Sequence, residues 1–126
     1  MSALKFINEQ MEFLEIPYEF NEWTSETIPK MYFVGEEYRE DEASTEDGAT
    51  TASMILTGFH RGKYIVLEEA KERIKEHFDQ IFGLRSQTDS GAIAVFFGDA
   101  FSIPSGEANL TKIQITLKIK EWKGVF

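Results

Sequence analysis

Apolar residues recur at helical spacing in two segments of the chain. Ser2 is a suitable N-cap for the first segment, which Pro17 ends, and Gly83 stands where the second predicted helix should stop. Glu69 and Arg73 are spaced for an ion pair on the polar side of the second helix. The two apolar stripes consist of Leu4, Phe6, Ile7, Met11, Phe13 and Leu14, and of Leu67, Ala70, Ile74, Phe78 and Ile81.

Four longer segments alternate between two sets of side chains, which is the pattern of strands. They are residues 30–38, 51–61, 91–101 and 112–122. The first of them is apolar on both faces around Phe33 and suits a strand that is covered on both sides, with Gly35 as a candidate bulge. Tyr18–Phe20 is a candidate short strand. In the last segment, Ile113, Ile115, Leu117 and Ile119 share one face, opposite Gln114, Thr116, Lys118 and Lys120.

The order of these elements predicts an α+β fold. Without the short candidate strand the order is α-β-β-α-β-β, a mainly antiparallel sheet of about four strands packed against two helices. With 126 residues and a mass of 14.5 kDa, the chain fits a single domain over residues 1–126. A hydrophobic content of 42% supplies enough apolar volume for one core.

A strongly acidic segment connects the first two long strands. Glu36–Asp47 contains seven carboxylates and one arginine, and so contributes −6 to the formal net charge of −9. We expect a flexible acidic loop at about residues 38–52 inside a hairpin, because like charges in one segment resist compact packing. The segment does not fit a calcium loop. Counted from Asp41, the third and fifth positions are Ala43 and Thr45, which carry no carboxylate.

The amino-acid composition argues against several classes of partner and of chemistry. The net charge of −9 and a pI near 4.7 argue against binding of nucleic-acid phosphates, which requires clustered Lys and Arg. The absence of Cys excludes disulfides, thiolate nucleophiles and cysteine-ligated zinc. The sequence starts without a basic region followed by an apolar run, and no stretch approaches about 18 consecutive apolar residues. We therefore expect an intracellular protein that does not enter a membrane.

The candidate catalytic motifs lack parts that their chemistry needs. GFHRGK at residues 58–63 resembles a truncated phosphate loop, but Tyr64 stands in place of the Ser or Thr that would bind magnesium. His60 and His77 are the only histidines and cannot form a metal-binding i,i+4 pair. We expect His60 to be exposed or to face a partner, beside Arg61 at a strand end, and His77 to be favoured as an imidazolium near a helix C-terminus. The sequence predicts no catalytic residue, no metal and no cofactor.

Three segments together resemble a known family. They are TEDG at Thr45–Gly48, SMILTGFHRG at Ser53–Gly62 leading into LEEAKERIKEHF, and FFGDAFSIPSGEANLTKIQITLKIKEW near the C-terminus. Over roughly residues 30–122 the chain is similar to small prophage-encoded proteins of siphophages with Gram-positive hosts. These proteins belong to the head-tail joining class called tail-completion or tail-terminator proteins. TGFHRG followed by the amphipathic helix is the most specific part of the resemblance.

The resemblance implies a non-enzymatic structural protein that caps the tail tube as a ring, usually six-fold. Its partners would be copies of itself, the tail tube protein and the head connector protein, first in the host cytoplasm and then in the virion. A closed ring needs two different, complementary patches on each subunit. The candidate interface residues are Glu40, Asp41, Glu42, Glu46, Asp47, His60, Arg61, Lys118 and Lys120.

The alternative is a monomeric acidic binding module inside the cell, for example a DNA-mimicking inhibitor. Mimicry favours acids at regular intervals on rigid elements, whereas the acids here are bunched in one segment. A small hydrolase ranks last, because no nucleophile has a recognisable base in the sequence.

Overall fold

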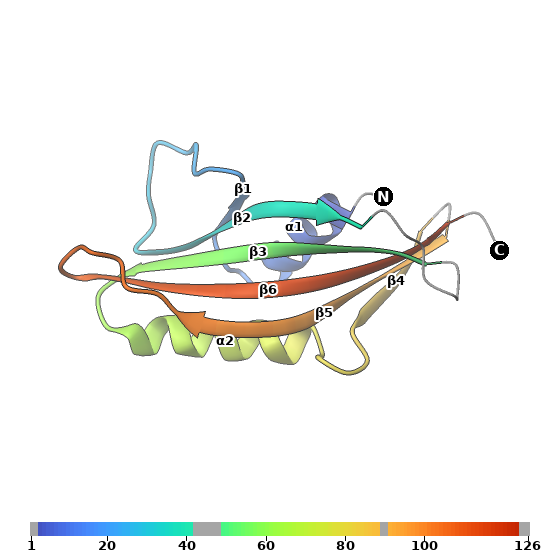
Figure 1. The fold of residues 1–126 in the computed structure, drawn as a ribbon. Coiled ribbons are helices and arrows are strands. Elements are labelled where there is room, and N and C mark those ends of the chain that lie inside the picture. Colours follow the sequence, from blue (N-terminus) through green and yellow to red (C-terminus); the bar gives the residue numbers. More distant parts are fainter. Residues whose placement is uncertain (1–2, 42–48, 89–90, 124–126) are drawn as a thin grey trace.

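The computed structural model describes residues 3–41, 49–88 and 91–123, which form two helices and six strands. The strands make one sheet in the order β1-β2-β3-β6-β5-β4, in which only β1 and β2 pair in parallel (Figure 1). Along the chain the elements are α1 (Ala3–Phe13), β1 (Tyr18–Phe20), β2 (Met31–Glu40), β3 (Ala49–Arg61), α2 (Tyr64–His77), β4 (Leu84–Thr88), β5 (Gly91–Ser102) and β6 (Leu110–Lys123).

The predicted fold of about four strands in the order α-β-β-α-β-β is wrong. The observed order is α-β-β-β-α-β-β-β, and the six strands form a curled half-barrel. The candidate strand at Tyr18–Phe20 is present as β1. The sequence of β4, LRSQT, carries no alternating apolar pattern, because this strand has a neighbour on one side only and buries little. Of the two short edge strands, the sequence therefore located β1 and missed β4.

Both helices pack against one face of the sheet, which we call the inner face. The register places Met54 opposite Leu117 and Leu56 opposite Ile115, and all four side chains are fully buried. The alternation predicted for residues 112–122 is thus confirmed, with the isoleucines and Leu117 turned inward. The same cluster includes side chains from both helices, namely Phe6, Ile7, Met11, Leu67, Ala70 and Ile74.

Two glycines explain how β2 fits into this sheet. At Gly58 a Cβ atom would lie 2.5 Å from Cε2 of Phe33, so the missing side chain leaves room for that buried ring. At Gly35 a Cβ atom would collide with the Tyr18 hydroxyl. Gly35 is therefore a close-approach position and not the expected bulge. The register shift lies between Glu36 and Arg39, where Glu37 has a φ of 50°.

Helix α2 ends at His77, six residues before the predicted stop at Gly83. The side chain of Asp79 accepts hydrogen bonds from the backbone N–H groups of Ile81 (2.8 Å) and Phe82 (2.7 Å). This short-range capture of the backbone competes with helix continuation, so Ile81 leaves the apolar stripe and is 77% exposed. Arg73 donates to the carbonyl of Leu14, which directly follows α1, where an ion pair with Glu69 was expected.

Candidate functional site

The outer face of the sheet carries a row of side chains that crosses four strands. The register sets Arg85 of β4 opposite Ala94 of β5, Ala94 opposite Lys120 of β6, and Lys120 opposite Thr51 of β3. Lys118, the neighbour of Lys120 on the same face of β6, lies opposite Phe96 of β5 and Ser53 of β3. Cationic side chains from β4 and β6 therefore gather on one part of the outer face.

A shallow groove of about 750 Å³ runs over these residues, and we call it the basic groove. Its basic lining consists of Arg85, Lys118 and Lys120, and Asp41 is its only acidic member among the described residues. Ile81 and Phe96 add apolar surface. A net positive groove on a chain with a net charge of −9 is suited to an acidic surface rather than to a neutral or basic one.

The connection between α2 and β4 presents two exposed apolar side chains beside this groove. Ile81 is 77% exposed and Phe82 is 70% exposed, and we call the pair the apolar tip. Figure 1 shows this connection, in yellow, projecting below β5. Exposed large apolar groups on a soluble surface commonly mark contact sites when they are grouped.

Four interactions fix the conformation of the apolar tip. The hydrogen bonds from Phe82 and Ile81 lower the pKa of the Asp79 carboxyl, which therefore stays ionised as their acceptor. Gln80 Nε2 donates to the carbonyl of Gly98 (3.3 Å), and Arg85 Nε donates to the carbonyl of Phe82 (3.0 Å). The tip is thus held against β5 and β4 by hydrogen bonds at both ends.

Gly83 supplies the last constraint on this connection. Its φ is +70°, in the left-handed region that favours glycine, and its N–H donates to the carbonyl of Asp79 (3.0 Å). A Cβ atom at Gly83 would lie 2.8 Å from Cε2 of Phe96, which also lines the basic groove. The geometry of the tip and the shape of the groove are therefore coupled through one ring.

The part of β2 that β1 leaves uncovered forms an acidic edge of the sheet. Beyond Gly35, β1 no longer covers β2, so Glu36–Glu40 has β3 on one side and no other described strand on its second side. Including Asp41, this edge carries four carboxylates and the guanidinium of Arg39, a net charge of −3. We call residues 36–41 the acidic edge. The Thr51 hydroxyl donates to the carboxylate of Asp41 and fixes it to β3.

Tyr38 lies within the acidic edge and is partly buried against the core. Burial raises the pKa of its hydroxyl to about 12, and the nearby carboxylates of Glu121 and Glu40 add to the effect. The phenol therefore remains neutral at physiological pH and adds no charge to this edge.

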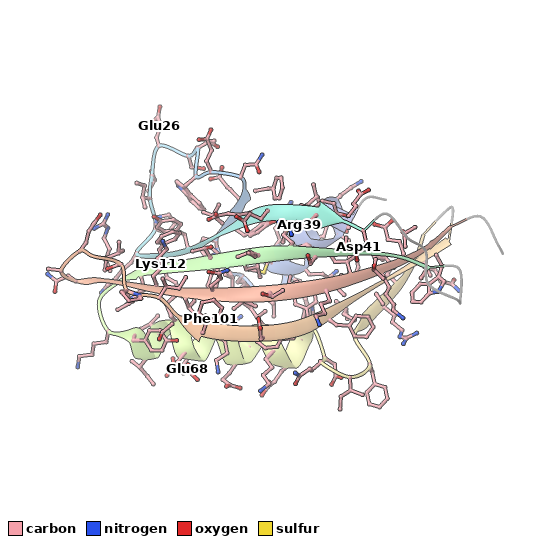
Figure 2. All side chains as sticks on the ribbon, viewed as in Figure 1. Glu26, Arg39, Asp41, Glu68, Phe101 and Lys112 are labelled. Atoms are coloured by element: carbon pink, nitrogen blue, oxygen red, sulfur yellow. The ribbon has the colours of Figure 1, made fainter. Side chains whose placement is uncertain are left out.

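Aromatic side chains occupy the other end of the outer face. The ring of Tyr32 stacks on Phe59 with centroids 5.0 Å apart, and Trp23 contacts Tyr32 at 5.1 Å. Lys112 Nζ lies 5.4 Å from the centroid of Phe59. In Figure 2, Lys112 and Phe101 lie toward the opposite end of the sheet from Arg39 and Asp41. The aromatic row and the basic groove are therefore separate surfaces.

The structure brings together three of the interface residues predicted from the sequence. Asp41, Lys118 and Lys120 all line the basic groove, and Glu40 adjoins it on the acidic edge. Arg61 is exposed at the far end of β3. Strands occupy both ends of the segment expected as a loop, since β2 continues to Glu40 and β3 begins at Ala49. The remaining candidates, Glu42, Glu46 and Asp47, lie outside the described residues.

The two histidines differ from what the sequence suggested. His60 was expected to be exposed or to face a partner, but it is only 4% exposed, because it shares the inward alternation of Met54 and Leu56. His77 is partly buried, and its Nε2 lies 2.7 Å from Oε1 of Gln10 on α1. Burial lowers the pKa of His77, so desolvation outweighs the expected preference for an imidazolium at the helix C-terminus.

Sequence reasoning missed Arg85, Ile81 and Phe82. Ile81 was assigned to a helix, and Arg85 lies on the unrecognised strand β4. The available signal was Asp79. An Asp side chain can accept hydrogen bonds from the backbone N–H groups two and three residues further on, and this commonly ends a helix.

In residues 3–41, 49–88 and 91–123, no three His, Asp or Glu side chains come together in a way that could hold a metal ion. No helix in the described part of the chain is long and apolar enough to cross a membrane. Comparison with protein-family models gives no match, and comparison with curated proteins gives none either.

Proposed function

We propose that this protein is a non-enzymatic subunit of a phage particle that caps the tail tube as a ring and joins it to the head connector. The observation that carries the proposal is the pair of unlike surfaces on one sheet, a basic groove bordered by the exposed tip and an acidic edge on β2. The resemblance in TGFHRG and the helix that follows it indicates the same class of protein.

A ring of identical copies requires this kind of asymmetry. Each copy must contact its neighbours through two different patches, because a single self-complementary patch closes into a two-fold dimer. The basic groove and the acidic edge meet that requirement, since their net charges are opposite and only Asp41 belongs to both. The tail tube and the head connector would then contact the two open sides of the ring, in the host cytoplasm during assembly and afterwards in the virion.

The proposal implies that an inducible prophage encodes the chain, and deletion of the gene from that prophage tests this function. We expect the deletion to yield filled heads and tails that fail to join, and complementation with the wild-type chain to restore complete particles. Antibody labelling of purified virions should place the protein at the upper end of the tail. Complete, infectious particles without the protein would contradict the proposal.

Charge reversal connects the basic groove to this role. Lys118→Glu with Lys120→Glu should prevent joining, because it replaces two cations of the groove with anions. The matched control is Lys112→Glu, which reverses a charge on the same strand and face but beside Phe59 at the far end. Equal joining by both variants would remove the groove from the mechanism.

The alternative, a monomeric acidic binding module, has a different experimental signature. It would be absent from purified virions and would leave head-tail joining intact on deletion. The prophage experiment therefore separates the two functions without an assay for an unknown ligand.

A further inference from the structure

The two side edges of the sheet differ in charge and in shape. On one side, the acidic edge at residues 36–41 carries a net charge of −3. On the other, β4 presents the exposed guanidinium of Arg85, and the exposed Lys118 lies two strands further in. The apolar tip projects beside Arg85. One copy of the chain therefore offers both members of a charge-complementary pair.

Strand direction allows these edges to meet between copies that point the same way. From β2 to β4 the sheet passes through antiparallel pairings of β2 with β3, β3 with β6, β6 with β5, and β5 with β4. An even number of reversals leaves β4 running in the same direction as β2. Copies related by rotation about an axis along the strands can thus set β4 of one beside β2 of the next, which is a head-to-tail contact.

The backbone of the acidic edge is too irregular to form a continuous ladder of hydrogen bonds with a second copy, so such a contact would depend mainly on side chains. The register of β2 shifts between Glu36 and Arg39, and Glu37 has a φ of 50°. A bulge interrupts the regular array of N–H and C=O groups that a continuous sheet needs. Charged side chains and the apolar tip, rather than an extended ladder of hydrogen bonds, would therefore select the partner.

We infer that the acidic edge of one copy docks against the β4 edge and basic groove of a second copy, with the apolar tip buried between them. This contact rests on the proposed ring function, because it supplies the two unlike patches that a ring requires. The occupant is a second copy rather than a nucleic acid, since the chain itself provides the acidic surface that the groove fits. Bringing β4 of two copies together would instead juxtapose Arg85 with its own counterpart.

Disulfide trapping tests the contact on the full chain, which contains no natural cysteine. Arg39→Cys places a thiol on the exposed acidic edge, and Gln87→Cys places one on exposed β4. Under mild oxidation, the double variant should form a ladder of covalent multimers. An equal mixture of the two single variants should stop at dimers that contain one of each. Glu69→Cys, exposed on α2, gives the background rate of random collision.

Charge reversal shows whether the trapped contact has the inferred polarity. Arg85→Glu with Lys118→Glu in the Gln87→Cys chain should lower the rate of cross-linking to Arg39→Cys by about tenfold or more. Glu36→Lys with Glu37→Lys in the Arg39→Cys chain should restore that rate, because both charges of the pair are then exchanged. Lys112→Glu in the Gln87→Cys chain is the matched control and should leave the rate unchanged.

Several outcomes overturn the inference. They are cross-linking of either single variant with itself faster than with the other, a mixed rate no higher than that of Glu69→Cys, and no rescue by the exchanged charges. The prophage assay is scored separately. If the protein is found in virions but forms no ladder of cross-linked multimers, the inferred contact is wrong and the proposed function stands. If the ladder forms but the protein is absent from virions, the contact stands and the proposed function is wrong.

Discussion

Replacing Gly83 with Ala should destabilise the fold more than the same replacement at Gly106. Both glycines have positive φ, +70° at Gly83 and +78° at Gly106, so both variants force an L-residue into the left-handed region. At Gly106 the new Cβ atom meets nothing within 4 Å, whereas at Gly83 it would lie 2.8 Å from Cε2 of Phe96. The pair of variants separates backbone strain from steric collision.

The expected magnitudes follow from these two contributions. The left-handed conformation costs an L-residue about 1–2 kcal/mol, which is the whole expected loss for Gly106→Ala. Overpacking against a ring adds about 1–3 kcal/mol, so Gly83→Ala should lose about 2–5 kcal/mol in total. With a urea m-value of about 1–3 kcal/mol/M, the unfolding midpoint of Gly83→Ala should fall by on the order of 1 M.

Urea unfolding followed by circular dichroism measures both losses. Phe96→Leu removes the ring atoms that the new Cβ would meet, so in the Gly83→Ala background it should recover part of the lost stability. A double-mutant cycle over positions 83 and 96 isolates that coupling. Equal losses for Gly83→Ala and Gly106→Ala, or a coupling energy of zero, would refute the reasoning. Gly83→Ala should also slow the disulfide trapping, because Phe96 lines the basic groove.

Three further predictions concern the core and its titrating groups. Gly58→Ala should lose about 1–3 kcal/mol in urea unfolding, because its Cβ would lie 2.5 Å from Phe33 and 2.9 Å from Ile113. Burial holds the pKa of His77 below its ordinary 6.5, so its contribution is complete above pH 6.5 and is lost as the pH falls toward the folded pKa. The urea midpoint of the wild type should therefore drop more across that window than that of His77→Gln. Burial raises the pKa of Tyr18 and Tyr38 to about 12, so both should remain protonated at pH 10 in a spectrophotometric titration. Their contribution to stability should fall as the pH rises from 10 toward 12, because the unfolded phenols ionise first.

The positions of the long elements could be predicted from the sequence because their patterns are local. The inward set from Ile113 to Ile119 on β6 follows from period-two alternation, and all four of its members are buried. The same rule would have placed His60 inside, since it shares the alternation of Leu56. That error came from reading the neighbouring Arg61 as a sign of exposure, although adjacent residues of a strand face opposite ways.

The edge strand β4 and the end of α2 were less accessible to sequence reasoning. β4 needs no apolar alternation, because a strand with one neighbour can remain largely polar. The end of α2 depends on one carboxylate, Asp79, whose hydrogen bonds to Ile81 and Phe82 compete with a helical pattern that continues to Gly83. At the end of α2 a specific local contact overrode the hydrophobic period, whereas β4 carries no apolar alternation to detect.

Local patterns of apolar residues are enough to locate the helices and the long strands, and to tell which side of each strand is apolar. Arg85, Lys118 and Asp41 line one groove only because the sheet brings together β4, β6 and the end of β2, which are far apart in the chain. The spacing of apolar residues along a helix or strand depends only on residues that are near one another in the sequence. Strand order is instead selected by burying the inner face of the whole sheet against both helices, and the outer face receives whatever that order brings together.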